Sequence, residues 1–144
     1  MRFTIKTKAK SVWTMPKRRL IREFMVYANC YLGLHSWDEK VVIRLTGDKY
    51  SPGMCCDLED HFVVKVSGNQ SNYDILETLL HELVHVRQYA SGQLDDLNDN
   101  TSEWMGHIYQ GDFQDTESSA YWNAPWEVEA REVAEELANF YYQN

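Results

Sequence analysis

Apolar residues recur at helical spacing in three stretches of the chain. In the first, after Pro16, apolar positions from Leu20 to Tyr31 fall three or four residues apart. This spacing is typical of an amphipathic helix, and the glycine that follows at position 33 is a common stop signal. We predict a helix that ends near Gly33.

The second and third stretches carry clear start and stop signals. Ser71 or Asn72 is the expected N-cap of a helix of about five turns that stops at Gly92. Pro125 opens the last stretch, whose helical pattern continues almost to the final residue. Both segments are predicted to be helices.

Between the first two helices, the pattern changes to short β-branched runs. The segments KVVIRLTG and HFVVKVSG predict strands at residues 40–46 and 61–67, with a turn at SPG between them. Residues 94–103 are polar and read as irregular, and residues 104–113 can hold one short strand. The order of helix, strands, helix, loop and helix predicts an α+β fold with a small mixed or antiparallel sheet. Without an internal repeat or a Pro/Gly linker, residues 1–144 are expected to form one domain.

The composition favours a soluble protein of a reducing compartment. The 144 residues are 44% hydrophobic and 25% charged. No segment approaches the roughly 18 uninterrupted apolar residues of a membrane helix, and the first residues lack the apolar run of a signal peptide. The cysteines, Cys30, Cys55 and Cys56, are odd in number and include a neighbouring pair, which is a poor disulfide framework. We expect reduced thiols, a cytoplasmic protein and a monomer.

The charge is unevenly distributed along the chain. The net charge is −8, but residues 1–22 hold eight Lys/Arg and no acid, so the remainder carries six Lys/Arg against all 22 acids. An acidic body argues against nucleic acid as the main partner, because phosphate binding needs a broad basic surface. We expect the basic N-terminal arm and helix, about residues 1–33, to be solvated or to lie on the acidic body.

HELVH at residues 81–85 is the strongest chemical signal. On a helix, His85 lies ~40° around and ~6 Å along from His81, so both imidazoles can bind one ion. Glu82, about 100° away, is placed to take a proton from water as a general base. Leucines and valines dominate the opposite face, whereas Thr78 and Gln88 share the histidine face, which is compatible with a cleft. An exposed histidine pair without a metal is the alternative.

A catalytic zinc site needs a third protein ligand. In the last helix, Glu129 lies at the edge of an apolar stripe, whereas Glu127, about 200° away, points elsewhere. We predict Glu129 as the third ligand and His107 as its rival. If no metal binds, Glu129 is an acidic residue in the first turn that only interacts favourably with the helix dipole. The stripe consists of Trp126, Val133, Leu137, Phe140 and Tyr141.

The segments HELVHVRQYASGQL, EWMGHIY and PWEVEARE resemble small HExxH metallopeptidases that bacteriophages often encode, minimal relatives of the gluzincin proteases. The resemblance covers residues 73–133. It implies that His81 and His85 bind zinc, that Glu82 is the catalytic base, and that Glu129, followed by alanine, is the gluzincin glutamate. Val133 stands where thermolysin-type members carry an aspartate, so one contact that tunes the metal is missing.

The predicted function is zinc-dependent hydrolysis of peptide bonds in a peptide or protein substrate. Tyr121 is the first choice as donor to the oxyanion, followed by His107 and Tyr109. If residues 61–67 form an edge strand, an extended substrate can pair with it. The alternative is a non-catalytic acidic module that binds a protein partner, with or without zinc. A role in nucleic-acid binding through the basic segment ranks last.

Overall fold

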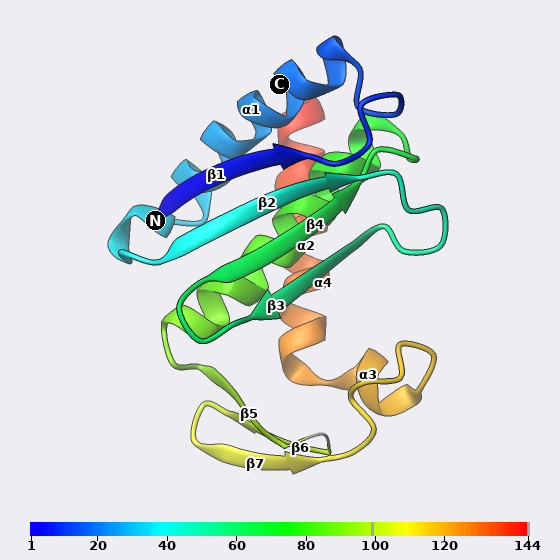
Figure 1. The fold of residues 1–144 in the computed structure, drawn as a ribbon. Helices are drawn as coiled ribbons and strands as arrows, with labels where there is room; N and C mark the ends of the chain where they lie inside the picture. The colour runs from blue at the N-terminus through cyan, green and yellow to red at the C-terminus, as the bar shows by residue number, and fades with distance from the viewer. Residues whose placement is uncertain (99, 144) are drawn as a thin grey trace.

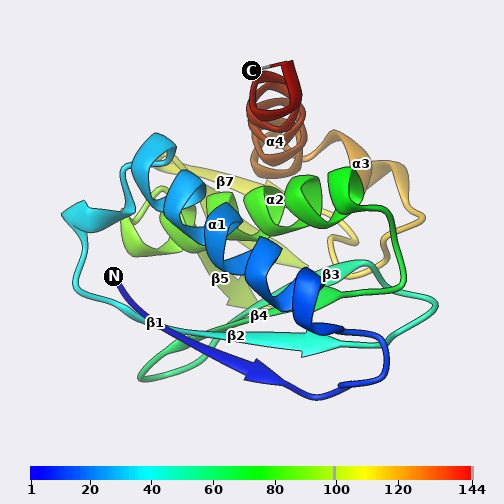
Figure 2. The same ribbon diagram turned by 90° about the horizontal axis from the view of Figure 1, so that it is seen from above.

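A four-stranded sheet, two helices laid across one of its faces and a third long helix beyond them form successive layers (Figures 1 and 2). The computed structural model describes residues 1–98 and 100–143. The elements confirm the predicted α+β class. In chain order they are β1 (Arg2–Thr7), α1 (Met15–Tyr31), the 3-10 turn η1 (Leu34–Ser36), β2 (Lys40–Thr46), β3 (Gly53–Asp57), β4 (Phe62–Ser67), α2 (Asn72–Ala90), β5 (Leu94–Asn98), β6 (Thr101–Trp104), β7 (His107–Gln110), α3 (Ser119–Asn123) and α4 (Pro125–Gln143).

The larger sheet has the strand order β1-β2-β4-β3. β1, β2 and β4 are parallel, and β3 is antiparallel to β4. The inward-facing side chains are apolar, and they meet the apolar faces of α1 and α2 in a common core. Its largest fully buried members include Trp13, Phe24, Ile43, Leu45, Leu76, Leu79 and Leu83.

The two strands predicted before α2 are confirmed, but their place in the sheet was not foreseen. β4 lies between β2 and β3, so both of its edges are paired. The hypothesis that residues 61–67 receive an extended substrate is therefore wrong. The edge strands are β1 and β3; β3, which follows the SPG turn signal and pairs with β4, was not predicted.

The N-terminal basic segment is also more structured than an arm. Residues Arg2–Thr7 form β1, paired in parallel with β2, because the alternation of Phe3 and Ile5 with polar residues suits a half-buried strand. In the segment expected to be irregular, β5 pairs with β6, and β6 pairs in turn with β7, in a second, antiparallel sheet; residue 99 of that segment lies outside the described residues.

A small apolar cluster joins this second sheet to the start of α4. Trp126 packs against Trp104, with ring centroids 6.2 Å apart, and against Phe113, at 4.8 Å. Leu94 and Ala124 complete the cluster. The first turn of α4 is thereby fixed at the C-terminal end of α2. Within the described residues, no helix has the length and apolar character needed to cross a membrane.

Candidate metal centre

The HELVH residues lie on α2, between the sheet and α4 (Figure 2). Ser71 caps the helix as expected, its Oγ accepting a hydrogen bond from the Asp74 backbone N–H at 3.1 Å. The leucine and valine faces of α2 are buried in the core. This packing leaves His81 partly buried and His85 buried, at 8% exposure, toward the first turn of α4.

Three side chains converge at this point. Nε2 of His85 lies 2.7 Å from Oε2 of Glu127, and Nε2 of His81 lies 3.3 Å from Oε1 of the same carboxylate. The two Nε2 atoms are 3.2 Å apart. Three ligands at about 2.0–2.2 Å from a tetrahedral ion would be separated by ~3.3–3.6 Å. His81, His85 and Glu127 therefore have the chemistry and nearly the spacing of a three-ligand metal site.

The structure corrects the third residue of the predicted set. Glu127, not Glu129, lies with the histidines, and its side chain is 4% exposed. The Glu129 carboxylate instead accepts a hydrogen bond from Nε2 of Gln88 at 3.2 Å. The assignment of Glu129 as a metal ligand does not agree with this geometry.

The reason is the face that α4 turns toward the core. Its fully buried positions after the first turn are Ala130, Ala134 and Ala138. Glu127 precedes Ala130 by three positions and shares the face of all three alanines. Small side chains let two helices approach closely, whereas the larger apolar residues that guided the prediction, such as Val133 and Phe140, are half-buried or exposed. The alanine spacing was the sequence signal that could have identified Glu127.

Gln88 is a second residue that sequence reasoning did not recognise as part of the site. It is fully buried, and its Oε1 accepts a hydrogen bond from Nδ1 of His85 at 2.8 Å. Its Nε2 donates to the backbone carbonyl of Trp126 at 3.0 Å. Because Gln88 engages Nδ1, the other ring nitrogen of His85 is left to face Glu127. Gln88 thus orients the imidazole and ties α2 to the first turn of α4.

The His85 imidazole and the Glu127 carboxylate shift each other's pKa values. Burial alone would lower the pKa of His85, but the hydrogen bond and negative charge of Glu127 outweigh it and raise that pKa to about 9. Burial tends to raise the pKa of Glu127, yet the hydrogen bonds from His81 and His85 hold it well below its usual range. The protonated His85 imidazole and the ionised Glu127 carboxylate therefore stabilise each other.

The stability of the metal-free protein should depend on this pair. The folded-state pKa of His85 lies above its ordinary value of 6.5, so its stabilisation is complete below pH 6.5 and is lost as the pH rises toward 9. The folded-state pKa of Glu127 is lowered instead, so its contribution to the unfolding free energy is present at neutral pH and is lost as the pH falls into the acid range. We expect chelator-treated protein to lose roughly 3 kcal/mol of unfolding free energy between pH 6.5 and 9. Urea titrations at several pH values measure this loss. If the unfolding free energy of a His85→Gln variant falls with pH as steeply as that of the parent, His85 is not the source of the loss.

Glu82 lies next to the cluster and faces β3. Burial raises the pKa of its carboxyl, and the neighbouring imidazoles partly offset that rise. β3 approaches this helix face closely, because a Cβ at Gly53 would overlap Cγ2 of Thr78 and lie only 3.3 Å from Cγ of Glu82. Glycine at position 53 therefore permits the edge strand to run directly beside Glu82.

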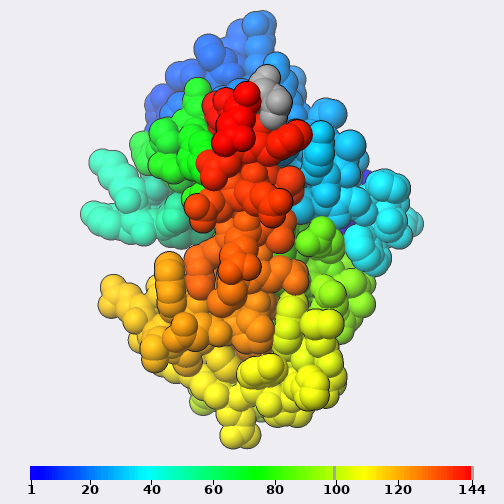
Figure 3. Space-filling view, turned by 180° about the vertical axis from the view of Figure 1, so that it is seen from behind, coloured from blue at the N-terminus to red at the C-terminus, as the bar shows by residue number. Residues whose placement is uncertain are grey.

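A groove passes over these residues. One part, of about 480 Å³, opens between the segment around Tyr50 and that around Trp122; Figure 3 shows the hollow beside α4. The other part, of about 370 Å³, continues past Cys55 toward Asp96. The residues common to both parts are Ser51, Gly53, Glu82, Thr116, Tyr121 and Glu127. The cluster thus lies at the middle of a groove walled by β3.

The three candidate oxyanion donors are placed differently. Tyr121 lines both parts of the groove, and burial, followed by the negative charge of Glu127, raises the pKa of its hydroxyl. His107 is exposed on β7 and does not belong to the cluster. Tyr109 packs edge-on against Trp126, with centroids 5.8 Å apart. Of the three, Tyr121 is the one that the fold brings to the groove.

Comparisons with protein-family models, with curated proteins and with solved structures found no match for this chain.

Proposed function

We propose that this protein is a zinc-dependent metallopeptidase. The observation that carries the proposal is the convergence of His81, His85 and Glu127, whose ligand atoms lie within 4.8 Å of one another, beside Glu82 in an open groove. Two imidazoles and one carboxylate are a ligand set found in zinc hydrolases, which keep a fourth position for reaction. Bound zinc would supply a Lewis acid for a carbonyl oxygen and would lower the pKa of water.

The side chains of the groove have suitable roles in hydrolysis. The Glu82 carboxylate takes a proton from the attacking water and delivers it to the leaving amine. Its raised pKa brings proton affinity closer to neutral pH, which favours both halves of this transfer. The Tyr121 hydroxyl stays protonated, since its pKa is raised, and can donate to the developing oxyanion.

The substrate would bind as an extended chain along β3. In the described part of the chain, β4 is the strand paired with β3, which leaves the other edge of β3 available along the groove. An added strand satisfies its backbone hydrogen bonds there and lies across Glu82.

Metal content and hydrolysis together test this proposal. Purified protein should hold one zinc per chain, cleave unfolded casein, lose activity with a chelator and regain it with added zinc. The zinc-loaded protein should also unfold at a higher denaturant concentration, because a ligand at 100 times its Kd adds about 2.7 kcal/mol to the unfolding free energy. Zinc binding without hydrolysis would favour a non-catalytic zinc module, and absence of zinc binding would refute the proposal.

A prediction concerns the buried Gln88. Gln88→Leu removes the acceptor that orients His85, and loss of such a partner typically costs about 10–100-fold in metal affinity. Competition with a chromogenic chelator measures the change. Glu129→Gln is the control, because it alters another contact of Gln88 and leaves the bond to His85 intact. Equal zinc affinity of Gln88→Leu and the parent would exclude the orienting role.

A further inference from the structure

The outer face of the four-stranded sheet is basic, although the protein as a whole is acidic. The helices cover the opposite face, and none lies over this one (Figures 1 and 2). Outward-facing positions of β1, β2 and β4, with the residue after β1, carry six of the 14 Lys/Arg of the chain. These six residues, here called the basic face, are Arg2, Lys6, Lys8, Lys40, Arg44 and Lys65.

The cations of the basic face lie in register across adjacent strands. Lys6 is opposite Arg44, and Arg44 is opposite Lys65. Like charges directly opposite one another destabilise a sheet, so folding alone does not favour such a row. The Nε atom of Arg44 is also buried without a hydrogen-bond partner. The row of opposed cations and the unpaired guanidinium nitrogen are both features expected of a surface that binds an anionic partner.

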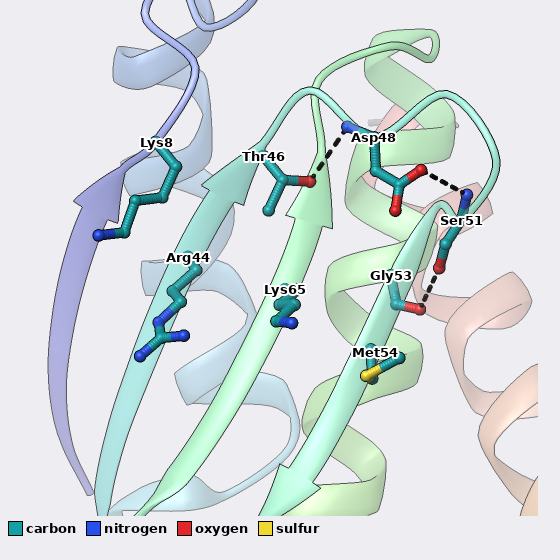
Figure 4. Close-up of a pocket in the computed structure, with 8 residues that line it drawn as sticks. All are labelled: Lys8, Arg44, Thr46, Asp48, Ser51, Gly53, Met54 and Lys65. Atoms are coloured by element: carbon teal, nitrogen blue, oxygen red, sulfur yellow. Dashed lines mark hydrogen bonds between the residues drawn. The ribbon is translucent and has the colours of Figure 1, made fainter.

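A hollow of about 280 Å³ lies at one end of the basic face, lined by Lys8, Arg44 and Lys65 (Figure 4). The carboxylate of Asp48, at its margin, already accepts hydrogen bonds from the backbone N–H groups of Tyr50, at 2.8 Å, and Ser51, at 3.2 Å. Within residues 1–98 and 100–143, none of the three cations forms an ion pair. The lining of the hollow therefore carries these three cations and one carboxylate, so it keeps an excess of positive charge for a ligand.

The hollow is continuous with the metal groove. Ser51 and Gly53 line the hollow and both parts of the groove, so they form the rim that separates them. A polypeptide lying along β3 needs to cross only this rim to reach the cations. A ligand that occupies the groove can therefore extend onto the basic face.

We infer that the basic face is a docking surface for an acidic segment of the polypeptide substrate, with Asp or Glu carboxylates held by Lys8, Arg44 and Lys65. That this segment belongs to a substrate rests on the proposed function. Nucleic acid is disfavoured because no aromatic side chain stands at an outward-facing position of β1, β2, β3 or β4 to stack on a base. Nearby acids of the groove, such as Glu77 and Glu135, would also repel a polyanion longer than the basic face.

Binding of a fluorescein-labelled octaglutamate peptide to the full chain, followed by anisotropy, tests the docking surface without requiring catalysis. Arg44→Glu/Lys65→Glu should weaken binding at least about tenfold, and binding should fall with salt. Arg19→Glu/Arg22→Glu on α1 is the matched control, because it makes the same charge change at exposed positions away from the sheet. Arg44→Gln/Lys65→Gln, expected to weaken binding in the same direction, serves if the charge reversal prevents folding.

Three results would overturn the inference: no binding of octaglutamate by the parent, equal weakening by both charge-reversal pairs, or tighter binding of an oligothymidylate at the same face. Hydrolysis separates the inference from the proposed function. If a peptide is cleaved, an added acidic tail should lower its KM in the parent but not in Arg44→Glu/Lys65→Glu, with kcat unchanged. Loss of octaglutamate binding in that variant, with no hydrolysis by any form, would keep the docking surface and refute the peptidase.

Discussion

Replacing Glu82 by glutamine is expected to lower peptide hydrolysis about 10²–10⁴-fold while zinc remains bound, since this is the usual contribution of a positioned general base. Glutamine keeps the size of the side chain beside Gly53 but cannot accept a proton from water. The proposed zinc ligands, His81, His85 and Glu127, are unchanged, so metal content should stay at one per chain. Parallel measurements of casein cleavage and of zinc by atomic absorption determine both quantities.

Glu77→Gln is the matched control for this variant. Glu77 lies on the same helix and lines the same groove, but it is not a member of the metal cluster. It should retain most of the activity. If Glu82→Gln cleaves casein as fast as the parent, another group takes the proton and the mechanism proposed for Glu82 is wrong.

Replacing Glu127 by glutamine should reduce zinc affinity by more than the roughly 10–100-fold typical of losing a residue that only supports a ligand. The amide preserves shape and can still hydrogen-bond to the imidazoles, but it lacks the negative charge that faces both Nε2 atoms. The hydrogen bond and, second to it, the charge of Glu127 raise the pKa of His85 against the effect of burial, so loss of the charge should lower that pKa. Hydrolysis should fall together with zinc content. Isothermal titration with zinc measures the affinity.

Glu129→Gln provides a direct comparison on the same helix. The sequence assigned the third ligand to Glu129, whereas the structure places that carboxylate against Gln88. Its substitution should change zinc affinity far less than that of Glu127. The reverse order of effects would show that the cluster around Glu127 is not the metal site.

Much of the fold follows from local patterns that can be read without tertiary contacts. The N-cap Ser71, the helix-opening Pro125 and the β-branched runs of β2 and β4 are local signals. The predicted helices and these two strands are accordingly confirmed to within three residues. β1, β3, β5 and β6 were missed because short strands are stabilised by their partners. β1, for example, pairs with β2, which follows it by more than 30 positions.

By itself, the sequence determined that His81 and His85 share one face of a helix with Glu82 beside them, because helical periodicity fixes those angles. Only the tertiary structure decided which glutamate joins them. Helical periodicity also placed Glu127 and Glu129 on different sides of α4, but the side that meets α2 depends on how closely two helices can pack. The small alanines of α4 allow that close approach, and they carry Glu127 into the site.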